Sequence, residues 1–96
     1  MIAFQRLPKE FTRDGGVHTL RLVMRTDTKA IYTLWIGEKF ISHEIIKISV
    51  APGGRVMPKG DILKPREVYP LPSRWGEEGW TIYDKNKALE KYNSLP

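Results

Sequence analysis

The sequence predicts an α+β fold: an antiparallel, strongly curved β-meander or small barrel with one C-terminal helix. Strand-like alternation dominates residues 17–50, and a single helical stripe follows at residues 85–94. The chain lacks the repeated strand–helix alternation of a parallel α/β fold. Its 96 residues are enough for one domain. We expect a β-meander over about residues 3–50, a wrapping segment over 51–73, and a tryptophan loop with the helix over 74–96.

Two neighbouring strands are predicted at residues 17–26 and 30–36, and a polar turn joins them. One antiparallel register sets apolar residues opposite one another on one face: Leu20 with Leu34, Leu22 with Tyr32, and Met24 with Ala30. The other face is only half polar, because Arg21 and Arg25 share it with Trp35 and further apolar residues. We therefore expect the sheet to curl on itself or to be covered on that second face.

The third predicted strand spans residues 40–50, after a hairpin turn at Gly37. Its apolar alternation changes phase once: Ile41 and Ile45 occupy one phase, and the later apolar residues from Ile46 onward occupy the other. A β-bulge near His43 and Glu44 would bring both sets onto one face, so we predict a bulge there.

The segment 51–73 predicts irregular wrapping rather than regular structure. It contains five of the seven prolines and three of the eight glycines. Turns are predicted at 52–54 and 58–60, with short extended pieces at 55–57, 61–63 and 66–69. Because proline cannot donate a ladder hydrogen bond, we expect at most one or two short edge strands.

The C-terminal segment begins with a tight loop, Trp75-Gly76-Glu77-Glu78-Gly79-Trp80. A last short strand is predicted at 80–83, with Trp80 as the anchor that leads into the helix. Asp84 is suited to cap a helix over residues 85–94. Its apolar stripe consists of Ala88, Leu89, Tyr92 and Leu95. A helix this short is marginal alone, so we expect it to dock on the sheet.

Composition excludes several chemistries. The chain has no cysteine, so disulfides and thiolate sites are absent, and it has no apolar run of membrane-spanning length. We expect a cytoplasmic protein that does not enter a membrane. His18 and His43 lack metal-site spacing, and the adjacent Glu77 and Glu78 are expected in solvent. The sequence predicts no catalytic residue, no metal, no cofactor and therefore no enzyme.

Two groups of basic and aromatic residues are the candidate binding sites in a chain of net charge +5. The candidate partner-binding residues are Arg66, Tyr69, Arg74 and Trp75. The candidate nucleic-acid-binding residues are Arg21, Arg25, Trp35 and Lys47. A simpler alternative, which we prefer for so short a chain, is that the rings belong to the core and the cations form its solvated rim.

The C-terminal third resembles small uncharacterised proteins of bacterial phages and mobile elements. The resemblance rests on the run 65–70, on Trp75-Gly76-x-x-Gly79-Trp80, and on the short helix with Ala88 and Tyr92. The resemblance implies that the chain is a short, cysteine-free accessory protein. Some accessory proteins of this kind bind and block host defence proteins such as CRISPR effectors. Many blockers that imitate DNA are acidic, whereas this chain is basic, which suits an acidic protein surface or a site where nucleic acid or a nucleotide binds.

These observations lead to two hypotheses. The first is a small non-enzymatic protein-binding module, an anti-CRISPR-like inhibitor with an unidentified protein partner. The alternative is a nucleic-acid-binding small β-barrel. An enzyme ranks third, and the oligomeric state is left unassigned.

Overall fold

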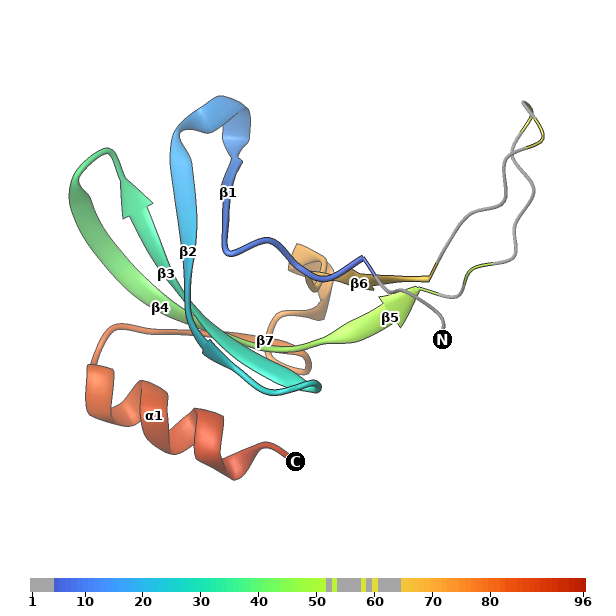
Figure 1. Ribbon diagram of the computed structural model, residues 1–96. Helices are drawn as coiled ribbons and strands as arrows, with labels where there is room; N and C mark the ends of the chain where they lie inside the picture. Colours follow the sequence, from blue (N-terminus) through green and yellow to red (C-terminus); the bar gives the residue numbers. More distant parts are fainter. Residues whose placement is uncertain (1–4, 52, 54–57, 59, 61–64) are drawn as a thin grey trace.

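The computed structural model describes residues 5–51, 53, 58, 60 and 65–96. Five antiparallel strands form the main sheet, in the order β1-β2-β3-β4-β7: β1 (Glu10–Arg13), β2 (His18–Arg25), β3 (Lys29–Ile36), β4 (Lys39–Lys47) and β7 (Gly79–Ile82). A two-stranded sheet contains β5 (Ser49–Ala51) and β6 (Arg66–Val68). Two 3₁₀ helices, η1 (Asp14–Gly16) and η2 (Pro72–Arg74), and the helix α1 (Lys85–Ser94) complete the described elements. The predicted α+β class is confirmed, and β1 and β7 remain the two edges of a sheet that is not closed into a barrel (Figure 1).

The hairpin of β2 and β3 follows the predicted register for its first half. Leu20 lies opposite Leu34, and Leu22 lies opposite Tyr32. Met24, however, lies opposite Ile31 rather than Ala30, because the register shifts between Leu22 and Met24. The extra residue reverses the alternation beyond it. Arg25 therefore lies opposite Ala30, on the face that also carries Tyr32, and not beside Trp35 as predicted.

The predicted bulge at His43 and Glu44 is wrong. Residues 42–47 pair with β3 without interruption, and the register shift lies instead between Leu34 and Trp35. Ile45 and Ile46 consequently point to opposite faces, and both are fully buried. The phase change in the sequence arises because this central strand is covered on both faces. The strand also ends at Lys47, and Ser49 begins β5.

The two faces of the main sheet carry separate apolar clusters. We call the first the helix face; its cluster is Ile31, Ile45, Ala88, Tyr92 and Leu95. We call the second the cleft face; its cluster is Leu20, Ala30, Tyr32 and Ile46, with Phe11, Tyr69 and Trp75 packed against it. Figure 1 shows α1 on one side of the curved sheet and the β6–η2 segment on the other. The expectation that the half-polar face would be covered is thus met by the helix.

The predicted helix and its cap are confirmed. The Asp84 carboxylate accepts hydrogen bonds from the backbone N–H groups of Asn86 (2.7 Å) and Lys87 (3.1 Å). At the other end, Lys29 Nζ donates to the carbonyl oxygens of Tyr92 (2.9 Å) and Leu95 (3.0 Å). A cation at these last carbonyls also opposes the negative end of the helix dipole. Both ends of this short helix are therefore fixed by polar contacts from outside it.

Part of the wrapping segment is described. The predicted extended piece at 66–69 largely becomes β6. The other predictions for this segment lie outside the described residues, apart from single positions in the two turns: they are the turns at 52–54 and 58–60 and the extended pieces at 55–57 and 61–63. The Glu67 carboxylate joins three segments of the chain: it accepts from both terminal nitrogens of Arg25 (2.7 and 2.6 Å) and from the Leu7 backbone N–H (2.9 Å). Within the described ranges, no helix has the length and apolar character needed to span a membrane.

Candidate binding cleft

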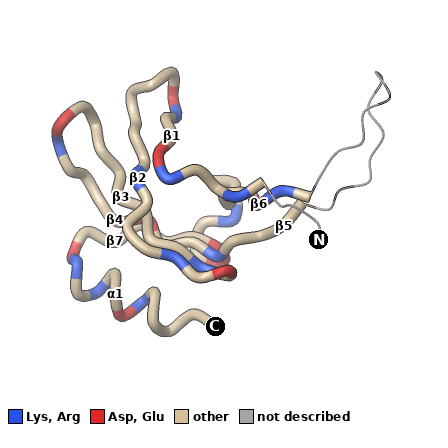
Figure 2. Tube along the Cα trace, viewed as in Figure 1, with Lys and Arg blue, Asp and Glu red and all other residues tan. Residues whose placement is uncertain are grey.

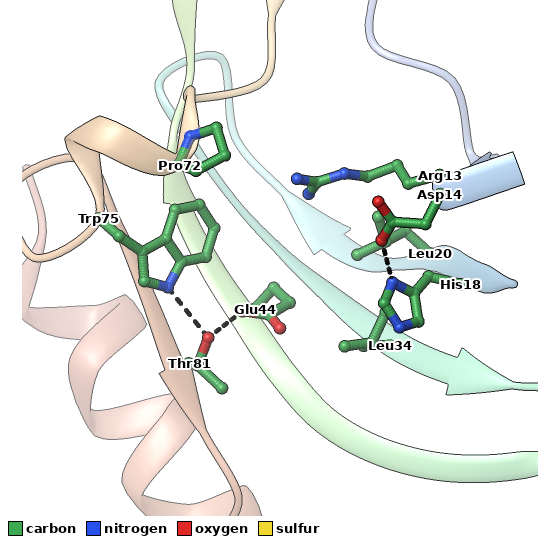
Figure 3. Close-up of a pocket in the computed structure, with 9 residues that line it drawn as sticks. All are labelled: Arg13, Asp14, His18, Leu20, Leu34, Glu44, Pro72, Trp75 and Thr81. Atoms are coloured by element: carbon green, nitrogen blue, oxygen red, sulfur yellow. Dashed lines mark hydrogen bonds and ion pairs between the residues drawn. The ribbon is translucent and has the colours of Figure 1, made fainter.

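A cavity of about 270 Å³ opens on the cleft face, between the β1–β2 turn and the tryptophan loop. Figure 3 shows Arg13, Asp14 and His18 along one wall, with Pro72 and Trp75 across from them. Leu20, Leu34, Glu44 and Thr81 complete the lining. The sheet curvature brings these walls together, although their residues are far apart in the sequence.

A chain of hydrogen bonds fixes the Trp75 indole. Trp75 Nε1 donates to Thr81 Oγ1 (2.9 Å), and Thr81 Oγ1 donates to Glu44 Oε2 (2.6 Å). Ser42 Oγ donates to the other carboxylate oxygen of Glu44 (3.1 Å). The Glu44 residue is only 6% exposed, and its burial raises the pKa of the carboxyl, although the two hydroxyl donors oppose that rise. Glu44 therefore acts as a buried support for the wall of the cleft.

The Trp75 ring also lies directly on the backbone of its own loop. A β-carbon added at Gly79 would lie 2.5 Å from a ring carbon of Trp75, so no larger residue fits under the ring without displacing it. Gly76 adopts a left-handed conformation (φ 96°), and its N–H donates to the Gly79 carbonyl (2.7 Å). These two glycines let the loop fold tightly around one ring, as the sequence indicated.

Arg13 lies on an aromatic stack. Its guanidinium carbon is 5.3 Å from the centre of the Tyr69 ring, and Tyr69 in turn stacks on Trp75 (6.0 Å between centroids, 29° between planes). Among the described residues, no carboxylate lies within ion-pair distance of Arg13. The Tyr69 hydroxyl is buried with no hydrogen-bond partner in that same part of the chain, and burial raises its pKa. The stack thus presents a half-buried cation whose donors are not used by an acid.

The β1–β2 turn holds an acid–base pair at the cleft. His18 Nδ1 contacts Asp14 Oδ2, and both Asp14 (φ 54°) and Gly15 (φ 68°) adopt left-handed backbone conformations. Among the described residues, the contact with Asp14 through Nδ1 is the hydrogen bond that the His18 ring makes. Within the described ranges, no three His, Asp or Glu residues are grouped so that they could hold a metal ion.

The arrangement favours binding by Arg13. Among the described residues that line the cleft, Thr81 supplies the one hydroxyl, and its Oγ1 already accepts from Trp75 and donates to Glu44. Both Glu44 oxygens likewise accept hydrogen bonds within the protein, and Asp14 Oδ2 contacts His18. Within the described part of the chain, Arg13 is the cation of the cleft that has no acidic partner.

The structure brings two of the four predicted partner-binding residues into direct contact. Tyr69 and Trp75 stack on each other, and both are half-buried. Arg74 is exposed, its Nε lies 3.2 Å from Glu78 Oε2, and it shares a neighbouring cavity of about 570 Å³ with Tyr69. Arg66 is exposed on β6 and lines neither cavity. The candidate surface is therefore centred on Tyr69 and Trp75, with Arg74 at its side.

The four predicted nucleic-acid-binding residues do not share one surface. Arg21 lies over Trp35 (5.0 Å to the ring centre), whereas Arg25 is paired with Glu67 on the opposite face. Lys47 lies on the helix face but beside a different ring, Trp80 (5.9 Å). Figure 2 shows basic and acidic positions interspersed along the described chain, without a continuous basic stripe.

Trp80 has the role that the sequence predicted for it. It packs against the helix-face cluster, and Lys91 Nζ of α1 lies 4.1 Å from its ring centre. The two tryptophans of the loop therefore serve opposite faces of the sheet: Trp80 contacts the helix side, and Trp75 forms a wall of the cleft.

Sequence reasoning missed Arg13, Asp14, Glu44 and Thr81 as residues of the site, and considered His18 only as a histidine without metal-site spacing. One usable signal was present: Glu44 is the one acidic residue in the predicted strand 40–50, directly before the apolar pair Ile45 and Ile46. The alternation of that strand also separates it from His43, whose Nδ1 lies 3.2 Å from the Ile82 carbonyl oxygen on the helix face. Arg13 and Thr81 carry no comparable signal, because their positions depend on the curvature of the sheet.

Comparison with known protein families, curated protein sequences and solved structures found no match to this chain. The function therefore has to be argued from the cleft itself, whose Arg13, Tyr69 and Trp75 side chains form a continuous stack beside a small cavity.

Proposed function

We propose that the protein is a small, non-enzymatic protein-binding module that holds a segment of a partner protein in the cleft between Arg13 and Trp75. The observation that carries this proposal is the Arg13 guanidinium, which lies on Tyr69 beside Trp75 with no acidic partner among the described residues. Arg, Tyr and Trp are the residue types that contribute most to binding energy at protein interfaces.

The size of the cleft supports a protein segment as its occupant. Its volume of about 270 Å³ is below the range of roughly 300–1,000 Å³ typical of pockets for drug-sized ligands. A cavity this small suits one side chain of a partner. Leu71, which is 67% exposed, lies next to Pro72 and lines the neighbouring cavity, so further contacts are available beside the cleft.

The charge of the protein supports an acidic partner surface. The net charge of +5 speeds encounter with an acidic protein, and an exposed cation mainly changes the rate of association. We place the complex in the cytoplasm, and we propose that the module blocks a host defence protein by stoichiometric contact. Support for this biological setting is the resemblance of the C-terminal third to phage and mobile-element proteins, together with the absence of cysteine.

A matched pair of variants tests the proposal. Arg13→Gln and Arg21→Gln each remove one charge from the β1–β2 ribbon, and each removes a guanidinium that lies over an aromatic ring. Affinity capture from bacterial lysate, followed by mass spectrometry, should recover a protein that wild type and Arg21→Gln retain and Arg13→Gln loses. Equal retention by all three proteins, at unchanged melting temperatures, would contradict binding in the cleft.

Nucleic-acid binding is the alternative function, and the contact of Arg21 with Trp35 is the observation that favours it. Base stacking on such a ring and phosphate contact with such a cation are typical of single-strand binders. This alternative predicts binding to DNA or RNA that weakens steeply with salt and is reduced in Arg21→Gln. No binding at low salt would remove it.

A further inference from the structure

The cleft combines a cationic group with an apolar lining. Figure 3 shows the Arg13 side chain extended across the cleft toward Pro72, with Trp75 on one side and Leu20 and Leu34 on the other. Leu20 is almost fully buried, so this apolar part belongs to the fixed core of the cleft face. A ligand that fits must therefore offer both an apolar group and a polar group that Arg13 can bind.

The polar group of such a ligand has to be a hydrogen-bond acceptor. Arg13 carries five N–H donors in a planar array that matches a carboxylate, and none of the described acids pairs with it. Both oxygens of Glu44 already accept hydrogen bonds, from Ser42 and Thr81, and Asp14 Oδ2 contacts His18. A cationic ligand would therefore meet an engaged Glu44 and an arginine that repels it.

Glu44 restricts where a negative charge can lie. It is almost fully buried, its two oxygens accept from Ser42 and Thr81, and it disfavours a second carboxylate beside it. A carboxylate is consequently placed at Arg13, and the apolar part of the ligand is placed against Trp75 and the two leucines. The volume of about 270 Å³ limits that apolar part to about one side chain.

These requirements describe the last residue of a protein chain. A C-terminal residue carries both a carboxylate and an apolar side chain on one carbon atom, whereas an internal Asp or Glu needs a second residue to supply the apolar group. Resting on the proposed function, we infer that the cleft binds the C-terminus of the partner, with its carboxylate on Arg13 and its last apolar side chain against Trp75.

The inference is tested with three synthetic peptides: an acetylated Gly-Ser heptapeptide ending in leucine with a free carboxylate, the same peptide amidated, and an amidated peptide with an internal glutamate. Binding is followed by NMR through the indole N–H of Trp75 and the Nε–H of Arg13. The free-acid peptide should shift both signals and bind at least about tenfold more tightly than the other two. Equal binding of the amidated peptide, or of the glutamate peptide, would overturn the inference.

Variants link the result to the cleft. Arg13→Gln should abolish the preference for the free acid, Arg13→Lys should keep part of it because a charge remains without the planar fork, and Arg21→Gln should leave it unchanged. No shift of the Trp75 signal with the free-acid peptide at up to about 10 mM, beyond the weak end of specific binding, would also count against the inference.

If peptide binding fails while a captured partner still requires Arg13, the binding module stands and the C-terminal ligand is wrong. If the peptide binds and no captured protein depends on Arg13, the proposed protein partner is wrong while the carboxylate site stands.

Discussion

The helix face and the cleft face share the same five strands but differ in the groups that cover them. On the helix face, Ala88, Tyr92 and Leu95 close an apolar cluster over Ile31 and Ile45. On the cleft face, the apolar cluster adjoins ionisable groups that are buried or half-buried, and both kinds of group line a cavity. Each face also has a cavity of about 270 Å³. Among the described residues, no acid lines the cavity on the helix face, whereas Asp14 and Glu44 line the one on the cleft face. The two faces therefore differ in the charged groups at their cavities.

Two acids on the cleft face, Glu44 and Glu67, have pKa values that are shifted in opposite directions. The Arg25 guanidinium holds the pKa of Glu67 below its ordinary value, whereas burial raises the pKa of Glu44. Glu67 is paired with a cation, whereas the described donors to Glu44 are the hydroxyl groups of Ser42 and Thr81. The two carboxyls therefore change the free energy of unfolding with pH in opposite directions.

The largest effect is expected on the helix face. Tyr92→Ala removes a buried ring from the cluster under α1, and the free energy of unfolding should fall by about 3–5 kcal/mol. Tyr83→Ala is the control, because this ring is 71% exposed and its loss should change stability by less than about 0.5 kcal/mol. Urea denaturation measures both. Similar losses in the two variants would show that the helix is not docked.

The next effect concerns the paired acid of the cleft face. The side chains of Arg25 and Glu67 are only 15% and 7% exposed, so Glu67→Gln leaves Arg25 without its charged hydrogen-bond partner and should cost about 2–3 kcal/mol at pH 7. A carboxyl with a lowered pKa adds stability above its unfolded pKa, and that stability is lost as the pH falls through the folded pKa. The difference between variant and wild type should therefore shrink in acid. A difference that stays constant with pH would exclude the ion pair as its source.

Gly79→Ala should damage the wall of the cleft while sparing the helix. The new methyl group collides with the Trp75 ring, and overpacking of this kind costs about 1–3 kcal/mol. The indole N–H signal of Trp75 should shift, because its hydrogen bond to Thr81 requires the present ring position. In a Trp75→Leu background the same substitution should cost much less. An equal cost in both backgrounds would place the damage elsewhere.

Removal of the helix cap should have a smaller effect. Asp84→Ala takes away the acceptor for the N–H groups of Asn86 and Lys87, so the melting temperature and the helical circular dichroism should both decrease. Asp84→Asn keeps a capping oxygen and should retain most of the wild-type stability. If Asn and Ala prove equally harmful, the negative charge rather than the cap is responsible.

The smallest effect at neutral pH is expected from Glu44→Gln, which keeps the shape of the side chain. An acid whose folded pKa is raised binds its proton more tightly in the native state, so stability is greatest below the unfolded pKa and is lost as the pH rises through the folded pKa. The variant should lack that decline. Denaturation curves between about pH 4 and pH 8, on either side of an ordinary glutamate pKa, measure it. If the stability of the variant falls equally as the pH rises, another titrating group is responsible for the decline.

Local patterns predicted much of the fold because they depend on residues near in sequence. The pairing of Leu20 with Leu34 and the cap at Asp84 needed only alternation and a capping oxygen. The predicted bulge at His43 and Glu44 was wrong because alternation was judged for a strand with one buried face, and β4 is buried on both. The strand β1 was not identified individually, since its four residues alternate too briefly to indicate a strand.

The candidate site was less predictable. Tyr69 and Trp75 were identified as partner-binding candidates from residue type, and they do lie together. Arg25 was grouped with Trp35, but one extra residue in β2 moved it to the opposite face and into contact with Glu67. A single-residue register shift has no clear signal in the sequence, yet it changes which face every later side chain occupies.

Patterns in the sequence are enough to predict the α+β class, the β2–β3 pairing through Leu22, the capped helix, and a tight loop with two tryptophans. Three further features depend on the tertiary structure: Trp80 contacts the helix face, Trp75 forms a wall of a cleft, and Arg13 of the edge strand β1 lies over the Tyr69 ring. The two groups of features differ in how far apart in the sequence the contacting residues lie. Periodicity and capping act over a few residues, whereas the cleft depends on how far the sheet curves and on where its bulges reverse the alternation.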